Sequence, residues 1–230
     1  MKIGSKTDPG KVREQNEDCY GYRGNLFVVA DGMGGHQAGE VASALAVETI
    51  LSAAMEPDIA GALKEAVSRA NRIILDETAR RPECEGMGTT VAVLALDGCL
   101  AYFTHVGDSR IYLWSRGELT QLTDDHSLVA ELVKNGGLSA EEAQIHPQRN
   151  ILTRALGTQG LPEVEVCSVP VRAGEKFLLC SDGLSGGLKE NMILQLLSEE
   201  APPQQIAANL VQAANDSGGA DNITVIVIEI

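Results

Sequence analysis

The chain has 230 residues, with 32 Asp and Glu against 18 Lys and Arg, which gives a formal net charge of −14. This balance excludes nucleic acid and anionic membrane as main partners, because binding to either depends on Lys and Arg that neutralise phosphates. A hydrophobic content of 44% with 22% charged residues excludes a disordered chain. The length is sufficient for one domain with a full hydrophobic core.

Neither targeting segments nor disulfides are expected. The start of the chain, Met1–Pro9, has no apolar run of the signal-peptide kind, and no stretch approaches the roughly 18 apolar residues of a membrane-spanning helix. The five cysteines are an odd number, widely spaced and without a C-x-x-C pair, which indicates reduced thiols. The sequence therefore predicts a cytoplasmic protein.

Hydrophobic periodicity predicts strands and helices in the first half of the chain. The apolar run 26–30 predicts a strand that ends at Asp31-Gly32. Two amphipathic helices should follow, at about 38–54 and 59–78. Three strands with hairpin punctuation come next, at 90–96, 100–106 and 110–114.

The second half begins with a helical pattern, from Asp125 to about Leu156, that glycines and a proline interrupt. A strand at 176–180 ends at Ser181-Asp182-Gly183. Two helices should follow, one from about Lys189 and one from Pro202-Pro203, since proline is tolerated in a first helical turn. The last segment, 223–230, is almost wholly apolar, which predicts a central strand covered on both faces.

We find no linker and no internal repeat, so 1–230 is expected to be a single domain. Strands joined by hairpins, with helices arriving in pairs between them, favour an α+β fold of antiparallel sheet covered by helices over a doubly wound parallel sheet.

Common catalytic motifs are absent. The sequence contains no Walker A loop, no complete G-x-G-x-x-G, no H-E-x-x-H and no G-x-S-x-G. The four histidines lack metal-pair spacing. The chemistry must therefore use carboxylates.

Acidic residues recur at the ends of predicted strands. Asp31 and Asp182 each follow an apolar strand, Asp221-Asn222 precedes the last one, and Asp108 lies at a break between two strands. If the last strand is antiparallel to the first two, these carboxylates share one rim, within reach of Glu17-Asp18. Each Asp-Gly could instead be an ordinary turn, as Asp97-Gly98 is expected to be.

Carboxylates that converge without matching bases repel one another, and a shared divalent cation relieves the repulsion. Oxygen ligands select hard ions such as Mg²⁺ or Mn²⁺. The number of ligands favours two ions bridged by Asp31, about 3.5–4 Å apart, which would make hydroxide available near neutral pH. Arg13, the basic residue nearest in sequence, suits bidentate phosphate binding, or is a solvated surface arginine.

These residues resemble the type 2C family of metal-dependent serine/threonine protein phosphatases over nearly the whole chain. Any one matching segment would be weak evidence, but the series in order is specific. In chain order the segments are Arg13–Asp18, Ala30–His36, Gly88–Thr90, His105–Arg110, Leu122–Ser127, Leu152–Gly157, Cys180–Leu184 and Asp221–Val225.

The resemblance implies a four-layer α-β-β-α sandwich of two antiparallel sheets flanked by helix pairs. It also implies two core Mn²⁺ or Mg²⁺ ions and, in bacterial members, a weaker third. Its implied site comprises Asp31 as the bridge, Asp182 and Asp221 on the first ion, Gly32 and Glu17 on the second, Asp108 with Asp182 on the third, Arg13 on phosphate, and Asp18 and Asn222 behind the ligands.

Two further assignments follow from the resemblance. The segment from about 126 to 156 corresponds to a mobile flap beside the cleft, where His126 and His146 are expected to be flap residues. Met33 stands where the eukaryotic branch has a general-acid histidine, and His36 lies three residues on, the bacterial pattern. His36 is therefore a tentative general acid, or a brace for the glycine-rich loop.

The expected function is hydrolysis of phosphoserine and phosphothreonine in proteins by a metal-bridging hydroxide, without a phosphoenzyme. Two alternatives stay open: a catalytically inactive phosphoprotein-binding regulatory domain, and a two-metal hydrolase of small phosphate esters. The expected partners are phosphorylated proteins, among them a Ser/Thr kinase and its substrates. The protein is expected to be a monomer.

Overall fold

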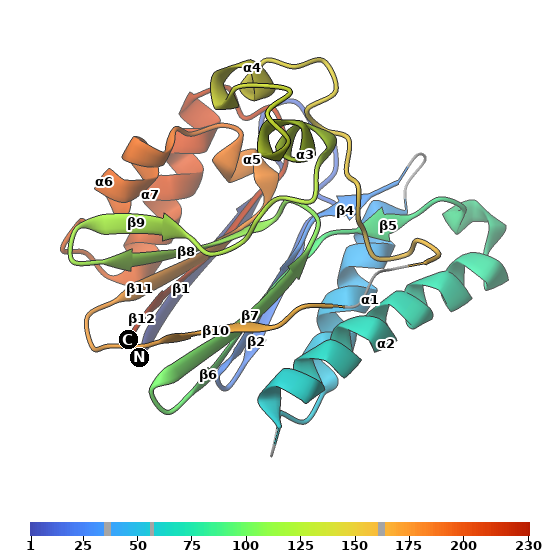
Figure 1. The fold of residues 1–230 in the computed structure, drawn as a ribbon, viewed down its shortest axis with the longest axis horizontal. Coiled ribbons are helices and arrows are strands. Elements are labelled where there is room, and N and C mark those ends of the chain that lie inside the picture. Colours follow the sequence, from blue (N-terminus) through green and yellow to red (C-terminus); the bar gives the residue numbers. More distant parts are fainter. Residues whose placement is uncertain (35–37, 56–57, 161–163) are drawn as a thin grey trace.

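Two five-stranded antiparallel sheets stack face to face, and helices cover the outer face of each (Figure 1). This architecture comes from a computed structural model that describes residues 1–34, 38–55, 58–160 and 164–230. The expected α+β fold with α-β-β-α layers is confirmed. A sheet with both faces buried needs strands that are apolar on both sides, which explains the apolar runs seen in the sequence.

The first sheet contains the last strand of the chain near its centre. Its strand order is β1 (Lys2–Asp8), β12 (Ile223–Glu229), β11 (Lys176–Cys180), β8 (Arg110–Ser115), β9 (Glu118–Gln121). Side chains of β12 alternate between two cores: Val225 and Val227 pack toward the helices, and Ile226 and Ile228 pack between the sheets. The prediction of a strand covered on both faces is confirmed.

The second sheet follows the same rule. Its strand order is β10 (Cys167–Pro170), β7 (Leu100–Val106), β6 (Val91–Asp97), β3 (Leu26–Ala30), β2 (Cys19–Arg23). Phe27 and Val29 of β3 face the other sheet, whereas Val28 and Ala30 face the helices. A short pair, β4 (Gly32–Met33) with β5 (Gly88–Thr89), continues beyond the end of β3.

Helices lie on both outer faces and at one end of the sandwich (Figure 1). The pair α1 (Gly39–Ser52) and α2 (Ile59–Arg80) covers the second sheet. The helices α5 (Asp182–Ser185), α6 (Glu190–Leu197) and α7 (Pro203–Asp216) cover the first. The short helices α3 (Leu128–Lys134) and α4 (Ala140–Gln144) lie at the top of the view, and Pro82–Cys84 forms a 3₁₀ turn.

Membrane-spanning structure is not found: among the described residues, no helix is long and apolar enough to cross a bilayer.

Most predicted elements are confirmed to within a few residues, but the two-residue strands β4 and β5 and the edge strands β1, β9 and β10 were not predicted. β1, β9 and β10 lie at sheet edges and consist mostly of exposed and half-buried residues, so they carry no apolar run. The helical pattern from Asp125 to about Leu156, all of which the structure describes, forms helix only at α3 and α4. The structure also differs after β11, where Asp182 begins the one-turn helix α5 rather than a plain turn.

The close packing of β1 on α7 depends on Gly4. A Cβ at Gly4 would lie 2.1 Å from the backbone carbonyl carbon of Pro203. We expect Gly4→Ala to lower the free energy of unfolding by about 1–3 kcal/mol, because the helix backbone must shift to accept the methyl group. Urea denaturation measures this change. Gly137→Ala is the control, since its added Cβ meets nothing closer than 3.4 Å; equal stability of the two variants would contradict this account of the packing.

Candidate functional site

Three strand ends bring acidic side chains to the same end of the sandwich. β12 is antiparallel to β11, with Val225 opposite Cys180, so the residues before β12 lie beside those after β11. Asp221 and Asp182 thus share a rim with Asp31, which follows β3. Burial raises the pKa of Asp31 well above its ordinary value, and the neighbouring carboxylates of Asp18, Asp182, Asp108 and Asp221 raise it further.

Asp31 is held in place through its backbone. Its N–H donates to Thr90 Oγ1 at 3.0 Å, and its carbonyl accepts from Thr89 Oγ1 at 2.8 Å. The next residue, Gly32, is packed so closely that a Cβ would lie 2.2 Å from the Gly39 carbonyl oxygen and 2.5 Å from that of Glu17. Only glycine fits at this position, where the chain passes between the start of α1 and the Glu17 backbone.

Asp18 and Asp182 each keep a buried oxygen without a hydrogen-bond partner. Ser181 Oγ donates to Asp18 Oδ2 at 2.7 Å, while Asp18 Oδ1 and Asp182 Oδ1 are buried and unpaired. Burial raises the pKa of Asp18 to about 7. The pKa of Asp182 is also raised, by burial and then by Asp221. Unpaired buried oxygens are costly, so this arrangement calls for a cation or a proton.

A second group of acids surrounds Glu17. The pKa of Glu17 is raised by burial and by Glu40, whose Oε2 is also buried and unpaired. Asn222 fixes the backbone here: its Oδ1 accepts from the Glu17 N–H at 2.8 Å, and its Nδ2 donates to the carbonyls of Pro9 and Gln15. Asn222 therefore joins the loop 9–17 to the start of β12 and supports both Glu17 and Asp221.

Asp108 lies in the turn between β7 and β8. Burial raises the pKa of Asp108 to about 7, with further contributions from Asp182 and Asp125. Gly107, just before it, has φ +101, and a Cβ there would lie 2.6 Å from Thr90 Cγ2. This turn therefore packs directly on the residue whose hydroxyl supports Asp31.

Arg13 pairs with Asp221 in this structure. Its Nη2 lies 2.8 Å from Asp221 Oδ2, and the Asn222 N–H donates to the other oxygen, Oδ1. The hydrogen bond to Asp221 raises the pKa of Arg13. Half of the Arg13 side chain stays exposed (55%), so its guanidinium can reach a ligand in solvent.

The donor set suits a hard divalent cation, although the carboxylates are not closed around one point. In the described part of the chain, no three His, Cys, Asp or Glu side chains are already arranged to hold a metal ion. The pairing of Asp221 with Arg13 and the mutual repulsion of the acids give a physical reason for this open arrangement. The unpaired oxygens of Asp18, Asp182 and Glu40 and the all-carboxylate chemistry fit Mg²⁺ or Mn²⁺.

Every predicted site residue except His36 can be placed. His36 lies outside the described residues. The sequence analysis missed two residues of this site, Glu40 and Ser181. Glu40 gave no functional signal, because an acidic residue in the first turn of a helix is already favoured by the helix dipole. Ser181 donates a hydrogen bond to Asp18.

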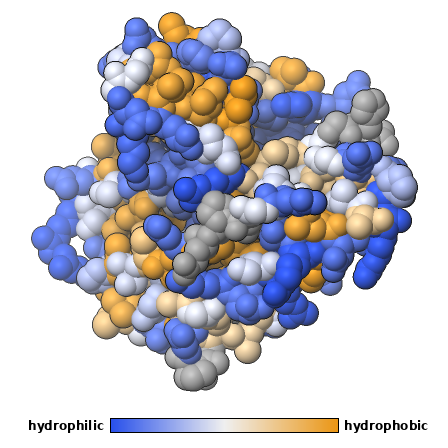
Figure 2. All heavy atoms as spheres, turned by 45° about the vertical axis from the view of Figure 1, so that its right-hand side comes forward, coloured by the Kyte–Doolittle hydropathy of each residue, from blue (hydrophilic) through white to orange (hydrophobic). Residues whose placement is uncertain are grey.

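The predicted flap, 126–156, contains α3 and α4 and exposes apolar side chains. Ile145 and Ile151 are 81% and 45% exposed. Figure 2 shows apolar atoms gathered at the top of the molecule, the level at which Figure 1 places these helices.

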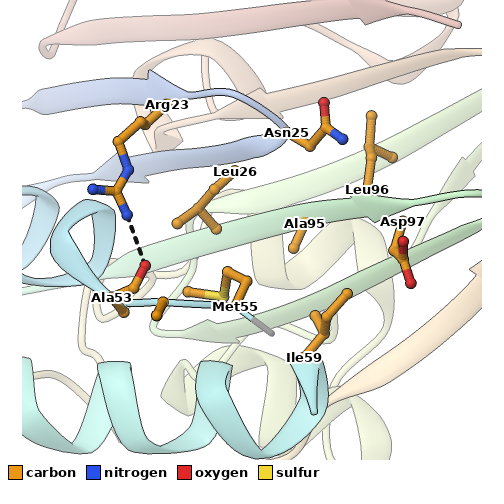
Figure 3. A pocket seen from close by; sticks show the side chains of 10 residues that line it. Arg23, Asn25, Leu26, Ala53, Met55, Ile59, Ala95, Leu96 and Asp97 are labelled. Atoms are coloured by element: carbon orange, nitrogen blue, oxygen red, sulfur yellow. Dashed lines mark hydrogen bonds between the residues drawn. The ribbon is translucent and has the colours of Figure 1, made fainter. Parts of the chain in front are cut away.

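A cavity of about 650 Å³ lies away from the acidic cluster, between the β2–β3 turn, the end of α1 and the end of β6 (Figure 3). Arg23 points across it and donates to the Ala53 carbonyl at 2.7 Å, which caps the end of α1. Asp97, of the predicted Asp97-Gly98 turn, also lines it. The cavity shares no residue with the acidic cluster.

The raised pKa values predict how stability depends on pH when no divalent ion is present. Asp18, Asp31, Asp108 and Asp182 keep protons in the folded chain that the unfolded chain has released by about pH 5, so stability falls as pH rises through the folded-state values. We expect the free energy of unfolding, measured by urea denaturation in chelator, to fall by about 1 kcal/mol or more between pH 6.5 and pH 8.

Two controls accompany this measurement. Burial lowers the pKa values of His105 and His126. These two histidines therefore make the stability rise with pH, but most of this rise occurs below about pH 7. Asp31→Asn should reduce the slope, and Mn²⁺ should stabilise the wild type more at pH 8 than at pH 6.5. A chelated wild type that is more stable at pH 8 would contradict the clustering of protonated carboxylates.

Comparisons with known proteins agree with this site. The family model described as Protein phosphatase 2C matches residues 14–224. The serine/threonine phosphatase stp of Listeria monocytogenes serotype 4b is 39% identical over 236 residues, which cover 97% of this chain and 94% of that protein.

Solved structures show the same fold. The crystal structure of the Mycobacterium tuberculosis serine/threonine phosphatase PstP/Ppp superposes with a TM-score of 0.94 at 39% identity, covering 100% of this chain and 98% of that one. A structure of the PstP catalytic domain in complex with two manganese ions has a TM-score of 0.91 at 37% identity, with coverage of 99% and 97%. The resemblance inferred from the motifs is confirmed: the chain belongs to the protein phosphatase 2C family.

Proposed function

We propose that this chain hydrolyses phosphoserine and phosphothreonine in proteins, and that two divalent cations at the acidic cluster make this possible. The observation that supports the proposal most strongly is the convergence of Asp31, Asp182 and Asp221 from three strand ends, with raised pKa values at Asp31 and Asp182. Among the described residues, only Arg13 forms an ion pair with one of these three. Family membership and the two manganese ions of PstP support the same function.

Each residue of the cluster has a distinct part in the proposal. Asp31, Asp182 and Asp221 would hold one ion, and Asp31 with Glu17 and the Gly32 carbonyl would hold the other. Asp108 would hold a third, weaker ion. Asp18 and Asn222 support the ligands through Ser181 and the Glu17 backbone. When bound, the ions lower the pKa of a water and neutralise a phosphoryl oxygen.

Arg13 is proposed to bind the substrate phosphate. In the present structure Asp221 holds its guanidinium, so the same side chain must exchange a carboxylate for the phosphate group. A planar guanidinium provides two parallel donors for this contact, which a lysine cannot. No acid–base role can be placed on His36, which lies outside the described residues, and its role as general acid stays a prediction.

The two alternatives are less well supported. An inactive phosphoprotein-binding domain would not need to keep Asp31, Asp108, Asp182 and Asp221 at one rim, with a buried unpaired oxygen on Asp182. A hydrolase of small phosphate esters would use the same metal chemistry, and the relatives named serine/threonine phosphatases favour protein substrates. Comparing the rate of hydrolysis of phosphopeptides with that of small phosphate esters decides between these two substrate classes.

We further propose the setting in which the chain acts. All five cysteines are free thiols, which supports the cytoplasm. Helices already cover the outer face of each sheet, which supports a monomer formed by one domain, 1–230. The segment 126–156, with its exposed Ile145 and Ile151, serves as the flap that contacts phosphorylated proteins, including a Ser/Thr kinase and its substrates.

The matched Asp-Gly dipeptides give a direct test. We expect Asp182→Asn to lower Mn²⁺-dependent phosphopeptide hydrolysis at least ~100-fold, because the change removes a negatively charged ligand of a metal ion. Asp97→Asn, in the Asp-Gly dipeptide at the end of β6, should retain wild-type activity. Phosphate release with and without Mn²⁺ measures both. Hydrolysis that persists in excess chelator, or an Asp182→Asn variant with wild-type turnover, would refute the proposal.

A further inference from the structure

Two histidine rings stack where the flap joins the rest of the molecule. His105 belongs to β7, and His126 is the first residue of the flap. Their ring centroids are 4.4 Å apart and their planes are 16° from parallel. His105 Nε2 donates to the Asp124 carbonyl at 2.7 Å, which leaves this ring fixed against the chain that enters the flap.

His126 is joined to Gly107 in both directions. Its backbone N–H donates to the Gly107 carbonyl at 2.9 Å, and its ring Nδ1 accepts from the Gly107 N–H at 3.2 Å. The carbonyl of His126 in turn accepts from the Thr153 N–H at 2.9 Å, near the far end of the flap. One residue thus connects both ends of the flap to the turn between β7 and β8.

The position of this turn determines where Asp108 lies. Gly107 has a left-handed backbone and packs against Thr90, and Ser109 Oγ lies 2.6 Å from Thr90 Oγ1. Asp108 is therefore held between two residues that are each fixed in place. Thr90 Oγ1 also accepts from the Asp31 N–H, so the contacts continue to the bridging acid.

The hydrogen bond to Gly107 requires a neutral His126 ring with an unprotonated Nδ1. Burial, the neighbouring His105 and Arg154 lower the pKa of His126 to about 4. The ring is thus an acceptor across the physiological range. A second connection, the fork of Arg110 on Asp125 at 2.7–3.2 Å, fixes the preceding residue but does not contact Gly107.

We propose that His126 is a positioning residue, whose ring holds Gly107 and so places the Asp108 carboxylate for the weaker third metal ion while tying it to the flap. The inference rests on the metal role proposed above for Asp108. It assigns to His126 no contact with substrate or metal. The consequence is that the flap and the third ion are linked through one residue, whose ring contributes the hydrogen bond from the Gly107 N–H.

Three variants separate the acceptor from the rest of the side chain. His126→Phe keeps a flat ring for stacking but has no acceptor. His126→Asn loses the stack but places an amide oxygen close to the position of Nδ1. His146→Phe is the matched control, because His146 is a half-buried flap histidine whose Nδ1 accepts from the Gln148 N–H within its own turn.

The first measurement is amide hydrogen exchange of Gly107 in the chelated protein, which does not depend on metal or activity. We expect exchange at Gly107 to accelerate at least ~10-fold in His126→Phe and far less in His126→Asn and His146→Phe. Protection at amides within β6 and β11 confirms that each variant is folded. Unchanged protection of Gly107 in His126→Phe, or equal loss in the His146→Phe control, would overturn the proposal.

The second measurement is calorimetric titration with Mn²⁺. We expect His126→Phe to raise the Mn²⁺ dissociation constant of the lowest-affinity site by about 10-fold, the lower end of the range for losing a group that orients a metal ligand. The dissociation constants of the tighter sites should stay within about 2-fold of the wild type. Asp108→Asn marks that site by removing it. If Asp108→Asn binds Mn²⁺ like the wild type, the metal role of Asp108 fails, whereas the Gly107 amide still reports separately on His126. A lowest-affinity site that is equally strong in His126→Phe would contradict the linkage.

Discussion

The burial of several carboxylates at one place, to which their mutual repulsion adds, is the constraint on which the rest of the structure depends. Asp18, Asp31, Asp108 and Asp182 all have raised pKa values, and in each case burial is the largest cause. Without bound protons or cations, the folded chain would not keep these groups side by side, because each buried charge carries a large desolvation cost. Protons or divalent cations must therefore accompany them. The net charge of −14 is thus partly a local property of one site.

The packing of the two sheets offsets the free-energy cost of placing these acids together. β12 is buried on both faces and β3 is buried throughout, so the ends of these strands are fixed by the cores on either side of them. Loops that carry the acids are then braced by neutral groups: Asn222 holds the Glu17 backbone and Ser181 holds Asp18. The carboxylates remain close together because the packing energy of the sheets opposes their repulsion.

How far the sequence predicts the molecule follows from burial. Apolar strands such as 26–30 and 176–180 and the amphipathic helix from Ile59 carry their own periodicity, and all are present in the structure. The edge strand β1 does not, because Gly4 is its only fully buried residue and the strand therefore carries no apolar run. At the site, placement of Asp31, Asp182 and Asp221 at one rim followed from strand direction. The pairing of Arg13 with Asp221, and the His105–His126 stack, join residues too far apart in sequence for any local pattern to indicate.

The most direct test of the central claim is the number of protons released when Mn²⁺ binds. Calorimetric titration of the chelated protein at pH 7, in two buffers of different ionisation enthalpy, gives both the number of ions and the number of protons displaced. The account predicts at least two ions per chain, with net release of protons from the acidic cluster, because Asp18 and Asp108 have pKa values of about 7 without metal. Binding of no ion, or binding that releases no protons, would contradict it.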